Sequence, residues 1–207
     1  MIEKPKSEGE LIKWALGESW EKLCPDIRRR FEKNPEVGKP IKYNGTLDEL
    51  TCSFWGKIIA SIAKPMIGGA LIPQTAYNFP VDIQVFCKDG CNHVFKHRIY
   101  KLPNRKPIEF ISYMKPGKNG KLLEYVGAGL GMNLIAYERD GDLHFKSDGY
   151  FWDIGLFRIP LPGFLSPGKV ALSHLNEGED KFRIRIDINH IIFGEMFTQA
   201  GLFYEIA

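Results

Sequence analysis

Apolar residues in the first part of the chain recur with the period of a helix. Leu11, Ile12 and Leu16 are spaced for one helical face, and Ser7 just before them is a residue type that caps helix starts. A second helix is expected to begin at Pro25, because proline is favoured in a first turn, and to stop at the next Asn-Pro pair. Each helix has one apolar side, so both are expected to cover an apolar surface.

A third stripe with helical spacing has lysines on its opposite side and is expected to end at Pro65, which a glycine pair follows. Its apolar members are Phe54, Trp55, Ile58, Ile59 and Ile62. The pattern is typical of a helix packed on the core. A lid over a cavity and a contact with a membrane surface are the alternatives, because an apolar face with tryptophan and flanking lysines suits an interface.

From residue 79 onward the hydrophobic period changes from 3.6 to two. Phe182, Ile184 and Ile186 alternate with charged residues, which is the pattern of a strand with one buried face. Hairpin turns are expected at residues 88–90 (Lys-Asp-Gly), 119–120 (Asn-Gly) and 140–141 (Asp-Gly). Residues 122–137 are apolar on both faces, as in a central strand, and the glycines at 127–131 are expected to mark a bulge, a bend or a close approach of another backbone.

These elements predict one domain over residues 1–207, with a helical part at about 8–70 and an antiparallel β part at about 79–206. The fold class is mainly β (α+β): a curved antiparallel sheet or β-barrel of about nine strands, with the N-terminal helices packed on one side. A composition of 44% hydrophobic and 13% aromatic residues is enough to build such a core and excludes a disordered chain. The prolines at 160–162 are expected to lie in a loop or an edge strand.

An ordered set of short segments resembles a known family. They are Cys-Pro-Asp-Ile-Arg at 24–28, Gly-Lys-Leu-Leu-Glu at 120–124, the glycines at 127–131, Ile-Pro-Leu-Pro at 159–162 and Phe-Gly-Glu at 193–195. The chain is similar to a bacterial domain family of unknown function, found alone or C-terminal to saccharopine-dehydrogenase-like Rossmann domains. The resemblance implies no activity, but it makes a dehydrogenase-like protein a candidate partner.

Charge and hydropathy narrow the classes of partner. A net charge of +3 spread over both signs does not indicate nucleic-acid binding. No apolar stretch reaches the length of about 20 residues that spans a bilayer, and the first residues lack the apolar core of a signal peptide, so we expect a cytoplasmic protein without a membrane span.

The four cysteines do not form a disulfide framework, and no metal site or cofactor is expected. Cys87, Cys91, His93 and His97 contain zinc-ligand residue types. However, the Asp-Gly turn between the cysteines indicates a hairpin, in which His93 and His97 lie about 13 Å apart along one strand at about 3.3 Å per residue. That separation is unsuited to one ion.

Several polar and aromatic residues are candidates for a binding site. An inward-facing acid on the central strand must be paired or have a raised pKa, and the residues around the turn after residue 188 could surround a barrel mouth. Hydrogen bonds that stabilise the turn are the simpler role for that second group. The candidate ligand-binding residues are Glu124, Tyr150, Trp152, His190, Glu195 and Gln199.

Three hypotheses for function follow. The first is that a small apolar or amphipathic molecule, such as a lipid or an acyl group, binds in a β-cup under the helix at residues 54–64. The second is an enzyme with Glu124 as general acid or base, assisted by His190. The third is an interaction module that docks onto the dehydrogenase-like partner.

Overall fold

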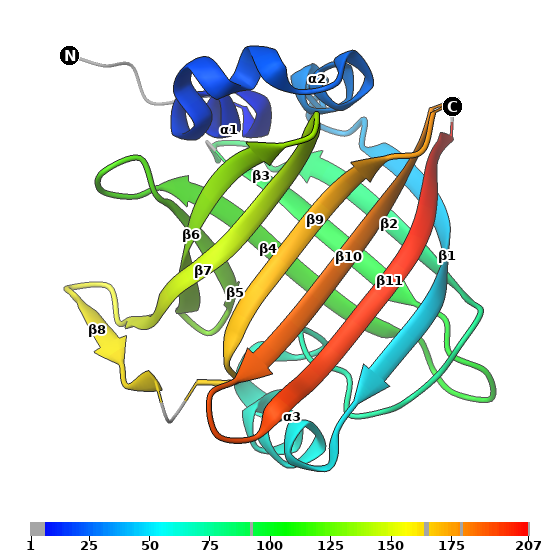
Figure 1. Cartoon of the computed structure of the whole chain (residues 1–207), viewed down its shortest axis with the longest axis vertical. Helices are drawn as coiled ribbons and strands as arrows, with labels where there is room; N and C mark the ends of the chain where they lie inside the picture. The colour runs from blue at the N-terminus through cyan, green and yellow to red at the C-terminus, as the bar shows by residue number, and fades with distance from the viewer. Residues whose placement is uncertain (1–6, 92, 164–165, 179, 207) are drawn as a thin grey trace.

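The computed structural model, which describes residues 7–91, 93–163, 166–178 and 180–206, contains a closed antiparallel barrel of ten strands (Figure 1). Around the barrel the order is β6-β5-β4-β3-β2-β1-β11-β10-β9-β7, and β7 pairs with β6 to close it. The predicted fold class is confirmed. The strands are β1 (Ile41–Cys52), β2 (Phe79–Cys87), β3 (Val94–Tyr100), β4 (Ile108–Pro116), β5 (Leu122–Gly127), β6 (Leu130–Arg139), β7 (Asp142–Asp153), β8 (Arg158–Leu161), β9 (Lys169–Asn176), β10 (Lys181–His190) and β11 (Gly194–Ile206).

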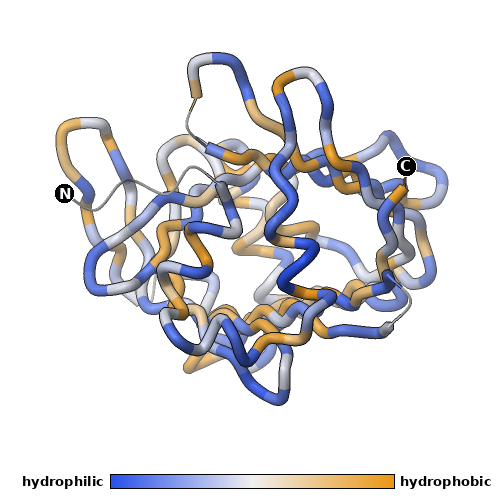
Figure 2. Tube along the Cα trace, turned by 90° about the horizontal axis from the view of Figure 1, so that it is seen from above, coloured by the Kyte–Doolittle hydropathy of each residue, from blue (hydrophilic) through white to orange (hydrophobic). Residues whose placement is uncertain are grey.

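Helices lie at both ends of the barrel. α1 (Glu8–Leu16), the 3-10 helix η1 (Gly17–Lys22) and α2 (Pro25–Glu32) cover one end, and α3 (Phe54–Ile67) lies at the other (Figure 1). Figure 2 looks at the α1/α2 end and shows hydrophobic and hydrophilic residues interspersed along the strands, as the period of two requires. The side chain of Ser7 accepts a hydrogen bond from the amide of Glu10 at 3.0 Å, so the predicted cap of α1 is present.

The part of the chain expected to be helical also contains a strand, β1, which pairs with β2 and β11. Its buried residues change phase: Tyr43 and Leu47 are buried in the first half, and Leu50 and Cys52 in the second. The cause is a bulge, since the register with β11 shifts between Leu47 and Glu49. A one-residue shift breaks the period of two, and this hid the strand from the pattern analysis.

Residues 122–137 are not one central strand but a hairpin, so that expectation was wrong. β5 and β6 are joined at Ala128 (φ 44°) and Gly129 (φ 78°), a two-residue turn with both φ angles positive. The expected close approach is present, because a Cβ on Gly129 would lie 2.2 Å from the carbonyl oxygen of Asp153. An Ala-Gly turn lacks the Asn or Asp that signals most such turns.

Prolines occur both inside a helix and in an edge strand. α3 continues through Pro65 to Ile67, two residues beyond the expected end, because a proline in the last turn disrupts little of the hydrogen-bond ladder. The segment with Pro160 forms β8, which in the described part of the chain pairs with β7 alone and lies outside the ring (Figure 1). The expected edge position of these prolines is therefore confirmed.

The close approach at Gly129 can be tested by comparing two turn glycines. Gly129→Ala is expected to lower the free energy of unfolding by about 2–4 kcal/mol, because the added methyl group meets the Asp153 carbonyl as well as straining the backbone. Gly120 also has a positive φ (73°) but has nothing within 4 Å of its Cβ position. Gly120→Ala should therefore cost only about 1 kcal/mol. Urea denaturation measures the free energy of unfolding of both variants. Equal losses of stability would contradict the close contact at Gly129.

Candidate ligand cavity

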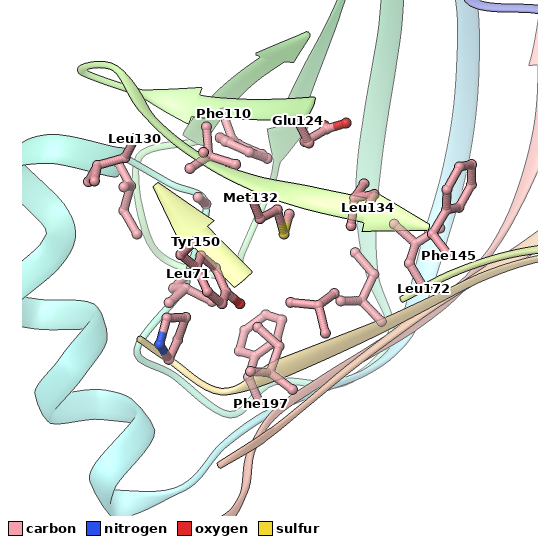
Figure 3. Close-up of a pocket in the computed structure, with 18 of the residues that line it drawn as sticks. Leu71, Phe110, Glu124, Leu130, Met132, Leu134, Phe145, Tyr150, Leu172 and Phe197 are labelled. Carbon is pink, nitrogen blue, oxygen red and sulfur yellow. The ribbon is translucent and has the colours of Figure 1, made fainter. Parts of the chain in front are cut away.

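A cavity of about 200 Å³ lies inside the barrel. Aliphatic and aromatic side chains form most of its wall, including Phe110, Met132, Leu134, Phe145 and Phe197 from the strands and Leu71 from the segment after α3 (Figure 3). α3 contributes Ile59, Ala63 and Ile67, which are spaced four residues apart on one face of the helix. Since an apolar cavity of about 150 Å³ takes up benzene, this space can hold a small apolar group.

Half of the predicted site residues line this cavity. Glu124 on β5, Tyr150 on β7 and Gln199 on β11 are part of its wall. Glu124 and Gln199 are buried, and the hydroxyl of Tyr150 donates a hydrogen bond of 2.7 Å to the carbonyl oxygen of Gly168. The structure therefore brings these residues from three separate strands around one space.

The other predicted residues lie outside the cavity wall, so the expected grouping of His190 and Glu195 with Glu124 is not formed. His190 is buried, and its Nδ1 accepts hydrogen bonds from the amides of Ile192 (3.2 Å) and Phe193 (3.4 Å). It follows a register shift at the end of β10, and its ring stabilises the turn. Glu195 is exposed at the start of β11, directly after that turn.

Trp152 is also outside the cavity wall. It lies near the end of β7, and its indole N–H donates to the carbonyl oxygen of Ala128 at 2.9 Å. This bond ties the end of β7 to the Ala-Gly turn between β5 and β6, so the described contacts of Trp152 are structural.

Glu124 is one member of a buried charge cluster. The Nζ of Lys96 lies 3.0 Å from Oε1 of Glu8 and 3.3 Å from Oε2 of Glu124. All three side chains are 14% exposed or less. Glu8 belongs to the first turn of α1, Lys96 to β3 and Glu124 to β5, so the cluster also attaches α1 to the barrel. Removing one member of such a buried pair typically costs roughly 3–5 kcal/mol.

The sequence reading did not identify the inward residues of β3. Lys96, Arg98 and Tyr100 alternate into the cavity, whereas His97 points outward and lies 2.9 Å from Glu109. Nη1 of Arg98 donates to the hydroxyl of Ser112 at 3.1 Å. Burial raises the pKa of Tyr100, with smaller opposing effects from the charge of Arg98 and a hydrogen bond with Gln199. The alternation with a period of two along β3 separates its residues into two faces. It does not show which of the two faces points into the barrel.

The surroundings of His174 inside the barrel lower its pKa. Burial lowers its pKa well below 6.5, and the positive charges of Arg30, Lys96 and Arg98 lower it further. Among the described residues, its Nδ1 is buried without a hydrogen-bond partner. The imidazole is therefore neutral at pH 7 beside several cations.

In the described part of the chain, no three His, Cys, Asp or Glu side chains are grouped to hold a metal ion. The cysteines, including Cys87 and Cys91, are free thiols. None of the described helices has the length and apolar character needed to cross a bilayer.

Fold and site together define a closed antiparallel β-barrel with an internal, mainly apolar cavity. The chain belongs to the family described as "Domain of unknown function (DUF4166)", whose model matches residues 23–203. This confirms the resemblance to a domain family of unknown function. The comparison does not show an association with saccharopine-dehydrogenase-like domains.

Other comparisons add little. No curated protein matches the chain. A solved structure described as "a putative thioesterase II from Thermobifida fusca YX" is similar with 7% identity and a TM-score of 0.26, covering 100% of this chain and 89% of the other. A likeness of that strength carries no argument about fold or function.

The neutral state of His174 leads to a pH prediction. Above about pH 6.5 the residue is neutral in the folded and unfolded states, whereas below it the unfolded chain binds a proton that the folded protein does not. Between pH 7 and 5.5, this linkage should lower the free energy of unfolding by roughly 1 kcal/mol. His174→Gln should lack this part of the loss. Urea denaturation at pH 7 and pH 5.5 measures the loss of stability in the wild type and in the variant. Equal losses in the two proteins would contradict the assignment of the effect to His174.

Proposed function

We propose that this protein binds a small apolar or amphipathic molecule, such as an acyl group or another lipid-like ligand, inside the barrel. The observation that supports this most directly is the cavity of about 200 Å³ with its aliphatic and aromatic wall. An apolar group that leaves water for such a space gains about 25 cal/mol per Å² of buried surface. A cavity of this composition favours an apolar ligand over a polar one.

The size of the cavity restricts the ligand. Pockets for drug-sized molecules are commonly about 300–1,000 Å³, whereas this one is about 200 Å³. The best fit is a short or medium acyl chain, or one part of a longer ligand. The wall includes Ala63 and Ile67 of α3, so this helix limits the length of the chain on that side.

The barrel also contains polar groups that suit an amphipathic ligand. Ligand pockets usually combine an apolar wall with a few placed polar groups that orient the ligand. Glu124, Tyr150 and Gln199 line this cavity among apolar residues. We therefore keep these three as proposed ligand-binding residues, and assign Trp152, His190 and Glu195 no contact with the ligand.

The other two hypotheses have less support. Catalysis by Glu124 with help from His190 requires both groups near one substrate, but His190 is outside the cavity wall and Glu124 is paired with Lys96. Docking onto a dehydrogenase-like partner remains a prediction from the family resemblance. A cytoplasmic location likewise remains a prediction.

Binding can be tested with decanol and decanoic acid as probes, by tryptophan fluorescence and calorimetry. Ala63→Phe projects a ring from α3 into the cavity and is expected to weaken binding about tenfold or more, equivalent to about 1.4 kcal/mol. Ser61→Phe is the matched control, because Ser61 is an exposed residue of the same helix and should leave the dissociation constant unchanged.

Two results would contradict this proposal. One is the absence of saturable binding by either probe to the wild-type protein. The other is equal affinity of the Ala63→Phe variant and the wild type, provided that both melt cooperatively. Native mass spectrometry of the freshly purified protein, followed by extraction, would identify a natural ligand that remains bound.

A further inference from the structure

We propose that Arg98 binds the anionic head group of the ligand, so that the natural ligand is an acyl carboxylate rather than an uncharged lipid. This inference rests on the proposed function and makes its ligand class specific. It comes from the imbalance of charge within the barrel, where two neighbouring cations on β3 have different partners.

Lys96 and Arg98 both line the cavity, but among the described residues only Lys96 has counter-ions. Its Nζ lies within 3.3 Å of carboxylate oxygens of both Glu8 and Glu124. In the described part of the chain, Arg98 has no carboxylate within ion-pair distance. Glu8 and Glu124 are already engaged with Lys96, so the charge of Arg98 is left uncompensated.

The hydrogen-bonding capacity of Arg98 is also mostly unused. Its guanidinium carries about five N–H donors. One nitrogen, Nη1, donates to the Ser112 hydroxyl at 3.1 Å, and the group lies 5.3 Å from the centre of the Phe110 ring. Since Arg98 is part of the cavity wall, the remaining donors can reach a ligand. A guanidinium in this state matches the two oxygens of a carboxylate.

A second, partly buried arginine strengthens the positive potential at this end. Arg30 borders a smaller cavity of about 60 Å³, which shares Glu8, Phe31, Lys96, Arg98 and His174 with the main one. Its Nη2 is buried without a hydrogen-bond partner among the described residues. An anion near Arg98 would reduce the cost of burying these like charges.

The arrangement also orients the ligand. Glu8 of α1 and Phe31 of α2 border the charged part of the cavity, whereas Ile59 and Ile67 of α3 border the opposite part. The carboxylate would therefore point toward α1 and α2, and the acyl chain toward α3.

The test compares decanoate with decanol at pH 7.5. The wild type should bind decanoate about tenfold tighter or more, and Arg98→Met should remove that preference while changing decanol affinity less than about threefold. Arg139→Met is the control, because Arg139 is an exposed arginine outside the cavity wall.

Each alternative outcome has a separate meaning. Equal affinity of the wild type for the acid and the alcohol overturns the head-group assignment, as does unchanged decanoate preference in Arg98→Met. The wild-type comparison alone decides the matter if the variant does not fold. Failure of both probes to bind the wild type would instead overturn the proposed function.

A different observation, on the outer surface, supports a second inference. Outside the cavity wall, α3 exposes large apolar side chains: Phe54 is 69% exposed, Trp55 45% and Ile62 74%. Trp55 stacks on Phe193 at 4.6 Å, which joins this face to the turn after β10, where Ile191 and Ile192 are also exposed. We infer that this surface docks on a membrane containing anionic lipids.

The charge pattern favours a lipid surface as the occupant. Residues 50–81, which include α3, contain Lys57 and Lys64 but no acidic residue, and Glu195 is an exposed acid next to the turn part of this surface. Both lysines are exposed on α3 beside the apolar face. Tryptophan, apolar side chains and lysines on one helix suit insertion at the headgroup level of an anionic bilayer. Ile59, Ala63 and Ile67 of the same helix line the cavity, so a lipid-derived ligand would have a short path into it.

Flotation with phosphatidylcholine vesicles, with and without phosphatidylserine, tests the docking surface. The wild type should bind the anionic vesicles more tightly, and Phe54→Ser combined with Ile62→Ser should lower the partition coefficient about tenfold or more. Val37→Ser is the control, since Val37 is an exposed apolar residue remote in sequence from α3. Absence of vesicle binding overturns the inference, as does self-association or capture of a protein partner through this face without vesicle binding.

Discussion

Closure of the ladder between β6 and β7 is the constraint on which the rest of the structure depends. An antiparallel ring of about eight strands is just wide enough for its own side chains to fill the interior. This ring has ten strands, so its inward side chains leave a cavity of about 200 Å³ even though many are large. The cavity is therefore a consequence of strand number and closure rather than of a few small residues.

The same closure forces charged residues into the interior. Every second residue of β3 points inward, and this includes Lys96 and Arg98. A buried cation is tolerated only with a counter-ion or another strong partner. Lys96 has both Glu8 and Glu124, so the helix at the α1/α2 end is attached by charge as well as by apolar packing. Among the described residues, Arg98 has only the hydroxyl of Ser112 and the ring of Phe110 as partners of this kind, which distinguishes it as the group proposed to meet a ligand.

The sequence predicted the fold better than the site. Alternation at Phe182–Ile188 and the Asn-Gly and Asp-Gly turns are local signals, and they sufficed for an antiparallel barrel. β1 was missed because its bulge changes the buried phase, and the turn at Ala128 was missed because it lacks the usual residue types. Arg98 could not be placed because alternation identifies two faces without saying which one is inside. His190 was placed near Glu124 by its position at a strand end, yet a register shift and a turn decide its surroundings.

The two ends of the barrel differ in a way that gives the cavity a direction. At one end, α1 is attached by an ion pair to Lys96, so opening it would expose separated charges. At the other end, α3 meets the cavity through Ile59, Ala63 and Ile67, and its loss would expose mainly apolar surface. Separating apolar surfaces is costly in water but much less so beside a lipid, where the exposed groups remain in apolar surroundings. The α3 end is therefore the one that a membrane surface could open, while in the proposed binding mode the charged end would retain the head group of the ligand.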